Sequence, residues 1–131
     1  MTVEQLGEKL PAYAKDLKLN LSSVLRQVEL TEQQTWGAAV ACAMASRNVD
    51  VTAAILGEAK QHLTPQAFDA AKAAAAIMGM NNVYYRFLHM TDNSKYATIP
   101  ARLRMQIIRG HGSDPVDFEL WCTAVSAINN C

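Results

Sequence analysis

Helix-start signals recur along this chain, and it contains no clear strand signal. Thr31 and Gln34 have the spacing of a capping box, in which each side chain accepts a hydrogen bond from the other residue's backbone N–H. Thr64-Pro65 and Asp114-Pro115 each place a capping side chain before a proline at the first helical position. No run of β-branched residues alternates with a period of two between turn residues. The pattern predicts an all-α fold.

The same start and stop signals divide the chain into several helices. We expect one short helix before Pro11 and a second short helix after it. Longer helices are expected over residues 31–46, 48–62, 64–78, 81–90 and 114–128. Asn48 or Asp50 can cap the helix over 48–62, and Gly79 is expected to interrupt the helical stretch that follows. Asn129-Asn130 should end the last helix, because Asn tolerates the left-handed conformation of a C-terminal cap.

Size and composition indicate one domain with an alanine-rich core. The 131 residues are 50% hydrophobic but only 7% aromatic, so small aliphatic side chains must fill much of the interior. Alanine has the highest helix propensity and lets neighbouring helices approach closely. We therefore treat residues 1–131 as a single helical domain.

Charge and hydropathy exclude several classes of partner. The 12 Lys and Arg balance the 12 Asp and Glu, so nothing attracts nucleic acid or an anionic membrane. The apolar-rich stretch over 70–80 contains Lys72 and is too short to cross a bilayer. The first residues do not resemble a signal peptide, and three scattered cysteines without one indicate a reducing compartment. We expect a cytoplasmic protein that binds neither nucleic acid nor membrane.

A weak internal repeat links two of the predicted helices. A shift of 85 residues aligns Trp36 and Val40 with Trp121 and Val125. It also places Gln34 on Glu119 and Ser46 on Cys131. One interpretation is a duplicated helical unit whose first copy keeps the architecture without the chemistry. The other is chance similarity between two alanine-rich amphipathic helices.

Cys131 and Glu119 are the pair most suggestive of a site. Leu120, Ala124 and Ile128 form an apolar stripe on the last predicted helix, and Cys131 follows its end. A cysteine where a further helix begins has its thiolate stabilised by the helix dipole. Glu119, among apolar neighbours, is expected to be a partly desolvated proton acceptor. The two lie about 120° apart around an ideal helix, so they meet only if the chain turns after residue 128. By spacing alone, a surface carboxylate and a frayed cysteine fit equally well.

The other cysteines and the histidines have simpler interpretations. Cys42 and Cys122 lie on alanine-rich helices, where a free thiol is usually a small buried hydrophobe. His62, His89 and His111 do not have the spacing of metal ligands with any cysteine, and we expect no metal site. His111 lies between glycines in a loop, where exposure to solvent is expected.

Three stretches, residues 10–23, 75–86 and 118–131, make the chain resemble the alkyl hydroperoxidase D proteins of the carboxymuconolactone decarboxylase-like family. In that family a Glu precedes a Cys-x-x-Cys motif, and a His follows four residues later. Glu119 matches the Glu and Cys131 matches the first Cys. The second Cys and the His have no counterpart among the 131 residues, so we expect this stretch of chain to be inactive by itself.

The resemblance implies an antioxidant dithiol oxidoreductase with weak peroxidase activity. It would take electrons from the lipoyl group of an acyltransferase component, pass them to the disulfide of a peroxiredoxin, and carry no bound cofactor. Glu119 would start a proton relay through the His to the second Cys, with Cys131 as disulfide partner and proton donor.

The resemblance also implies a homotrimer, and we expect Met78, Met80 and residues 84–87 at the subunit interface. The same residues would suit a pocket for a lipoyl chain or peroxide tail. Two alternative functions remain: a carboxymuconolactone-decarboxylase-like acid–base enzyme, against which Cys131 argues, and a catalytically inactive helical oligomerisation module.

Overall fold

The fold is all-helical, as the sequence predicts. A computed structural model describes all 131 residues and contains no strands. The helices are α1 (Val3–Glu8), a 3₁₀ turn η1 (Ala12–Ala14), α2 (Lys15–Arg26), α3 (Glu32–Ala45), α4 (Val49–Ala59), α5 (Pro65–Met90), α6 (Lys95–Thr98), α7 (Ile107–Gly110) and α8 (Pro115–Ile128).

The predicted caps set the helix starts. Thr31 and Gln34 form both hydrogen bonds of a capping box at α3. Thr64 accepts a hydrogen bond from the backbone N–H of Ala67 at α5, and Asp114 accepts two in the first turn of α8. Each bond satisfies a backbone N–H that has no partner within its helix. Asn48, rather than Asp50, caps α4.

Two predicted helix boundaries are wrong. α4 ends at Ala59 instead of near His62, which lies in the turn that follows. α5 runs unbroken through Gly79 for 26 residues. A glycine costs a helix only about 1 kcal/mol relative to alanine. Buried residues lie on both sides of Gly79, including Ala75, Ile77 and Asn82, and their packing keeps the helix continuous.

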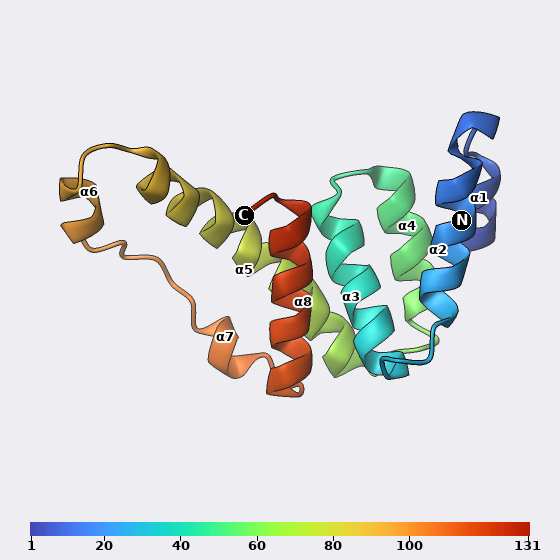
Figure 1. Cartoon of the computed structure of the whole chain (residues 1–131). Helices are drawn as coiled ribbons and strands as arrows, with labels where there is room; N and C mark the ends of the chain where they lie inside the picture. Colours follow the sequence, from blue (N-terminus) through green and yellow to red (C-terminus); the bar gives the residue numbers. More distant parts are fainter.

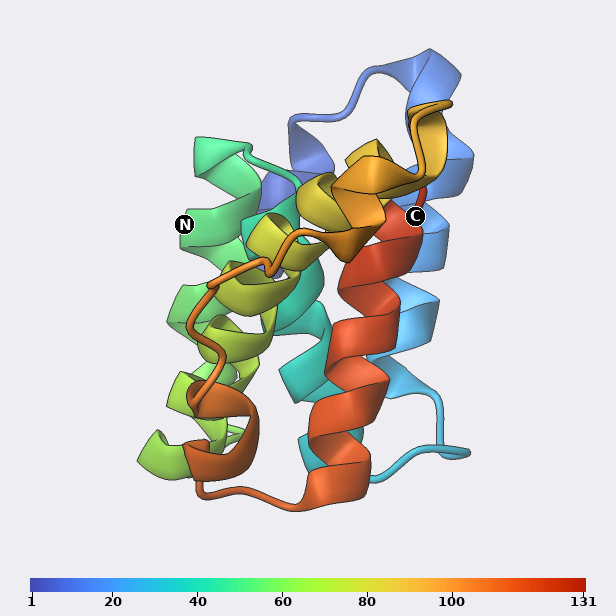
Figure 2. The ribbon, with the colours of Figure 1, turned by 90° about the vertical axis from the view of Figure 1, so that its left-hand side faces the viewer.

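Helices α3, α5 and α8 build the core. α3 and α8 lie side by side with their N-terminal ends together, and α5 crosses behind both of them (Figure 1). Side chains at the two N-termini join the pair, because the Gln34 amide donates a 2.9 Å hydrogen bond to Asp117. α1, α2 and α4 extend this layer on the side of α3 away from α8. The view from the side shows α8 and α5 crossing, with α6 and α7 lying outside them (Figure 2).

Trp121 fixes the distance between α3 and α8. Its side chain is fully buried, and its indole N–H donates a 3.1 Å hydrogen bond to the backbone carbonyl of Gln34. The ring lies directly on Gly37 of α3, where a Cβ atom would overlap it. Gly37 is therefore required by the close approach of a tryptophan, not by a turn.

The structure does not support the internal repeat as the sequence aligned it. Trp36 stacks on His62, with ring centroids 4.1 Å apart, whereas Trp121 is buried between α3 and α8. α3 and α8 do have equal lengths and matching ends. Their third residues, Gln34 and Asp117, are 83 positions apart, not the 85 of the sequence alignment. The different surroundings of the two tryptophans are the outcome expected from chance similarity.

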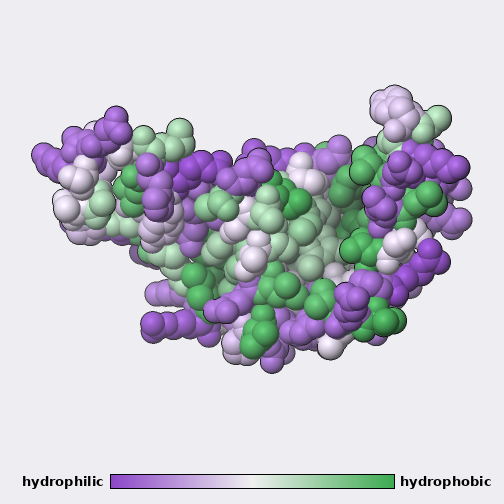
Figure 3. All heavy atoms as spheres, viewed as in Figure 1, coloured by the Kyte–Doolittle hydropathy of each residue, from purple (hydrophilic) through white to green (hydrophobic).

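Part of the surface is unusually apolar. The end of α5, α6, α7 and the segments between them form an arm, residues 87–110, that extends from the helical body (Figure 1). Phe87, Met90 and Ile99 on this arm are at least half exposed. Met78 and Met80, by contrast, pack against the core. Apolar surface is also visible in the centre of the molecule, over α2, α3 and α8 (Figure 3).

None of the helices combines the length and apolar character needed to span a membrane.

Candidate thiol site

A tight helix end holds Cys131 in place. Asn130 adopts the left-handed conformation, with φ of 56°. The backbone N–H of Cys131 donates to the carbonyl of Ser126 at 2.9 Å, and that of Asn130 donates to Ala127 at 3.2 Å. These two bonds define a Schellman motif. The predicted helix stop is confirmed, and it turns the chain so that Cys131 lies exposed beyond the end of α8.

The middle of α5 fastens this helix end to the core. Asn82, which is buried, donates a 3.0 Å hydrogen bond to the Ser126 hydroxyl and accepts one of 3.1 Å from the Asn129 amide. Arg86, one turn further along α5, donates to the backbone carbonyl of Asn129. The last turn of α8 therefore has three contacts with one face of α5.

A polar pocket opens beside this helix end. It has a volume of about 340 Å³ and lies between the C-terminal ends of α3 and α8 and the middle of α5. Its charged side chains are those of Arg47 and Arg86, and no carboxylate lines it. Nothing in the sequence places Arg47 or Asn82 near the thiol, and Arg86 was expected only within the 84–87 cluster at a subunit interface or in an apolar pocket. Arg47 is 35 or more positions from the other two, and Asn82 and Arg86 are 45 or more positions from Cys131, so no spacing rule joins these residues to the thiol.

Glu119 is not in contact with Cys131. It lies in the second turn of α8, nine residues before the end of the helix, a rise of about 13 Å. Its side chain is exposed, so the expectation of a partly desolvated carboxylate is wrong for the described residues. Phe118 and Trp121 lie on the buried face of α8, and position 119 is about 100° or more around the helix from both of them, toward solvent. Any proton exchange between Glu119 and the thiol region therefore needs intervening groups.

Cys122 and Cys42 are poor nucleophiles. Burial and the negative charge of Glu119 raise the pKa of the Cys122 thiol to about 11, because both disfavour the thiolate. Burial also raises the pKa of Cys42, which faces an apolar groove between α2 and α3. Both remain protonated near neutral pH. This agrees with their interpretation as small packing residues and leaves Cys131 as the exposed cysteine.

These differences predict the order in which the three thiols react. At pH 8, iodoacetamide should modify Cys131 first, while Cys122 should react about 100-fold more slowly than an ordinary exposed thiol, because its pKa of about 11 leaves little thiolate. The Cys122 rate should keep rising as the pH increases through 11. Mass spectrometry of the modified peptides measures each rate. Equal rates at Cys122 and Cys131 would contradict this account.

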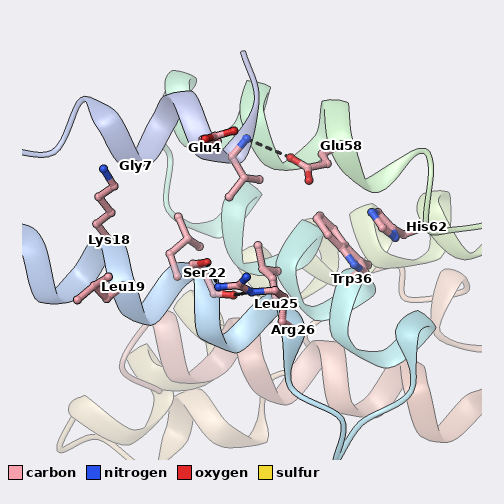
Figure 4. A pocket seen from close by; sticks show the side chains of 12 residues that line it. Glu4, Gly7, Lys18, Leu19, Ser22, Leu25, Arg26, Trp36, Glu58 and His62 are labelled. Carbon is pink, nitrogen blue, oxygen red and sulfur yellow. Dashed lines mark hydrogen bonds between the residues drawn. The ribbon is translucent and has the colours of Figure 1, made fainter.

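A second pocket lies at the opposite end of α3. The side chains of Leu25 and Trp36 contribute apolar surface between α1, α2 and α4, with Arg26 and Glu58 nearby (Figure 4). His62 at its edge is engaged on two sides, since its ring stacks on Trp36 and its Nδ1 lies 2.7 Å from Glu32. Glu58 accepts a hydrogen bond from the Val3 backbone N–H and so fixes the start of α1. His62 and Glu58 therefore have partners within the chain, and they serve to hold the surrounding helices together.

The remaining histidines do not form a site. His111 is half-buried and stacks on Phe118 with centroids 4.0 Å apart, so the expectation of solvent exposure is wrong. Gly112, in the left-handed conformation, folds the loop back so that this ring reaches α8. His89 is exposed on the last turn of α5. No three His, Cys, Asp or Glu side chains come together as a metal-binding group.

The fold and the site define an all-helical protein with one exposed cysteine at a rigid helix end. The chain matches no protein-family model. It is 64% identical over its whole length to the alkyl hydroperoxide reductase AhpD of Solibacter usitatus, covering 74% of that protein. It is 58% identical to AhpD of Acidobacterium capsulatum and 59% to AhpD of Koribacter versatilis, covering 72% and 68% of these proteins. The chain belongs to the AhpD family, and this membership supports an antioxidant oxidoreductase role.

Proposed function

We propose that the protein acts as a dithiol oxidoreductase of an alkyl hydroperoxide reductase system. It would take two electrons from the lipoyl group of a partner protein and pass them to the disulfide of a peroxiredoxin. The observation that carries this proposal is the contrast among the cysteines. Cys131 is exposed on a hydrogen-bonded turn, whereas Cys42 and Cys122 are half-buried thiols with raised pKa values.

The family motif supplies the steps of the exchange. The thiolate of the second motif cysteine would attack one sulfur of the peroxiredoxin disulfide, and the released sulfur would take the Cys131 proton. The Cys131 thiolate would then attack the sulfur of the second motif cysteine and release the peroxiredoxin thiolate, which would take back the proton held by the relay, leaving a reduced peroxiredoxin and an intramolecular disulfide. Two electrons from a dihydrolipoyl group would restore the dithiol. Glu119 would accept the proton that the motif His removes from the attacking cysteine.

A reconstituted reaction tests this proposal. The protein tested continues through the second cysteine and the His of the family motif. It is mixed with a peroxiredoxin and with a dihydrolipoyl-bearing protein as the only reductant. Peroxide consumption should require every component and should stop with Cys131→Ser, since serine forms no disulfide. Cys42→Ser is the matched control and should leave turnover unchanged. Turnover that survives Cys131→Ser would contradict the proposal.

We also propose that the protein assembles as a homotrimer in the cytoplasm. The exposed Phe87 and Met90 on the arm support an interface there, because apolar side chains of this size are usually covered. Sedimentation should show a trimer, and Phe87→Glu with Met90→Glu should shift it toward the monomer. Lys15→Glu with Asn20→Glu is the control, since these are exposed polar residues on α2, which lies on the side of the molecule away from the arm (Figure 1). A monomeric parent protein would contradict the assembly.

A further inference from the structure

The pocket at the C-terminal end of α8 contains two positive charges that no Asp or Glu among residues 1–131 pairs with. Arg47 and Arg86 both line it, and neither forms an ion pair with any Asp or Glu. Asn130, the residue before Cys131, lines the same pocket. The charged groups and the reactive thiol therefore share one end of the molecule, where α3 and α8 both finish (Figure 1).

Arg86 has only a partial structural explanation. Its side chain is half-buried and donates to the carbonyl of Asn129, which suits a cation at a helix C-terminus. A guanidinium has five N–H donors in a planar fork, and this contact uses few of them. The remaining donors of Arg86 face the pocket and are free to bind an anion that enters it.

Arg47 is exposed and has no polar side-chain partner among residues 1–131. It follows the end of α3 in the left-handed conformation, with φ of 59°, and its side chain makes no hydrogen bond. Glycine or asparagine takes this conformation at lower cost, and both are common at this position of a helix end. The backbone does not need an arginine here. The guanidinium on the rim of the pocket is the feature that asparagine would lack.

We propose that Arg47 and Arg86 form an anion subsite of the thiol site, which binds a carboxylate carried by the molecule that reacts with Cys131. Guanidinium groups hold carboxylates through two parallel, charge-assisted hydrogen bonds. A carboxylate bound here would place the rest of its molecule at the end of α8, beside Asn130, the residue that precedes Cys131. The inference rests on the proposed function only in taking Cys131 as the reacting thiol.

Two alkylating reagents of nearly equal size test the subsite. Iodoacetate carries a carboxylate and iodoacetamide is neutral, so the ratio of their rates at Cys131 reports anion recognition next to the sulfur. The ratio at the small neutral thiol N-acetylcysteine amide is the reference, because the charge of Glu119 next to Cys122 would itself repel iodoacetate. We expect Cys131 to favour iodoacetate relative to this reference. The preference should fall roughly two- to fivefold with Arg47→Asn or Arg86→Gln, as expected from losing one charge at close range in a wet site.

Matched variants separate charge from structure. Arg47→Asn suits the left-handed backbone, so thermal stability should not fall while the preference does. Arg86→Lys should keep most of the preference and Arg86→Gln should lose it. Added acetate should slow the alkylation of Cys131 by iodoacetate and leave its alkylation by iodoacetamide unchanged. Salt at 0.5 M should weaken the preference for iodoacetate. An unchanged ratio in the Arg47→Asn, Arg86→Gln double variant would overturn the subsite, as would protection by inorganic phosphate but not by acetate.

This test does not depend on peroxide chemistry. Alkylation requires a reactive Cys131 and no lipoyl or peroxiredoxin partner. If the unaltered protein shows no iodoacetate preference at Cys131 but has intact turnover in the reconstituted reaction, the subsite alone is rejected. A preserved preference without turnover would reject the proposed electron transfer and leave the subsite in place.

Discussion

Glu119→Gln should slow peroxiredoxin reduction by roughly 10²–10⁴-fold, the range expected when a general acid–base relay is cut. The test uses a chain that continues through the second cysteine and the His of the motif. Glutamine keeps the shape of the side chain and removes the group that titrates. The Glu119 side chain is exposed and forms no ion pair, so the fold should be unaffected. Steady-state peroxide consumption measures the rate.

The alkylation rate of Cys122 gives an independent measurement of the loss of the Glu119 charge. Glu119 contributes to the raised pKa of Cys122, so Glu119→Gln should lower that pKa and speed alkylation of Cys122. Residues 1–131 alone should show no turnover, because Cys131 has no second motif cysteine to resolve a mixed disulfide. A Glu119→Gln protein as fast as its parent, or rapid turnover by residues 1–131, would contradict the assigned roles.

Gly37→Ala should lower the free energy of unfolding by about 2 kcal/mol. The added methyl group would overlap the buried ring of Trp121, and overpacking of this kind costs roughly 1–3 kcal/mol or more. The higher helix propensity of alanine, about 1 kcal/mol, offsets only part of that cost. Urea unfolding followed by circular dichroism measures the difference.

Gly79→Ala is the matched control for this prediction. It makes the same chemical change inside a helix, but nothing lies within 4 Å of the added Cβ atom. Stability should therefore rise, by up to about 1 kcal/mol. In a Trp121→Ala background, Gly37→Ala should lose its destabilising effect, because the ring it meets is gone. Equal effects at the two glycines would show that α3 and α8 move apart at low cost.

The helices were predictable because their signals are local. A capping box needs only Thr31 and Gln34, and a helix stop needs only Asn129-Asn130. Errors arose where packing between distant residues decides the outcome. The neighbours of Gly79 keep α5 continuous, and Phe118 shields His111.

The candidate site was only half predictable. Cys131 could be found because one family motif contains it, and its role and that of Glu119 remain predictions. Arg47 and Arg86 come from the end of α3 and the middle of α5, and only the crossing of these helices brings them to the same pocket. Charge and spacing in the sequence give no information about such a crossing.

The continuity of α5 couples two parts of the molecule mechanically. Its middle holds the end of α8 through Asn82 and Arg86, and its last turn begins the arm with Phe87 and Met90. A single unbroken helix transmits rotation and tilt along its axis. A molecule that binds the arm and displaces it must therefore bend α5, break the contacts of Asn82 and Arg86, or move the turn that contains Cys131.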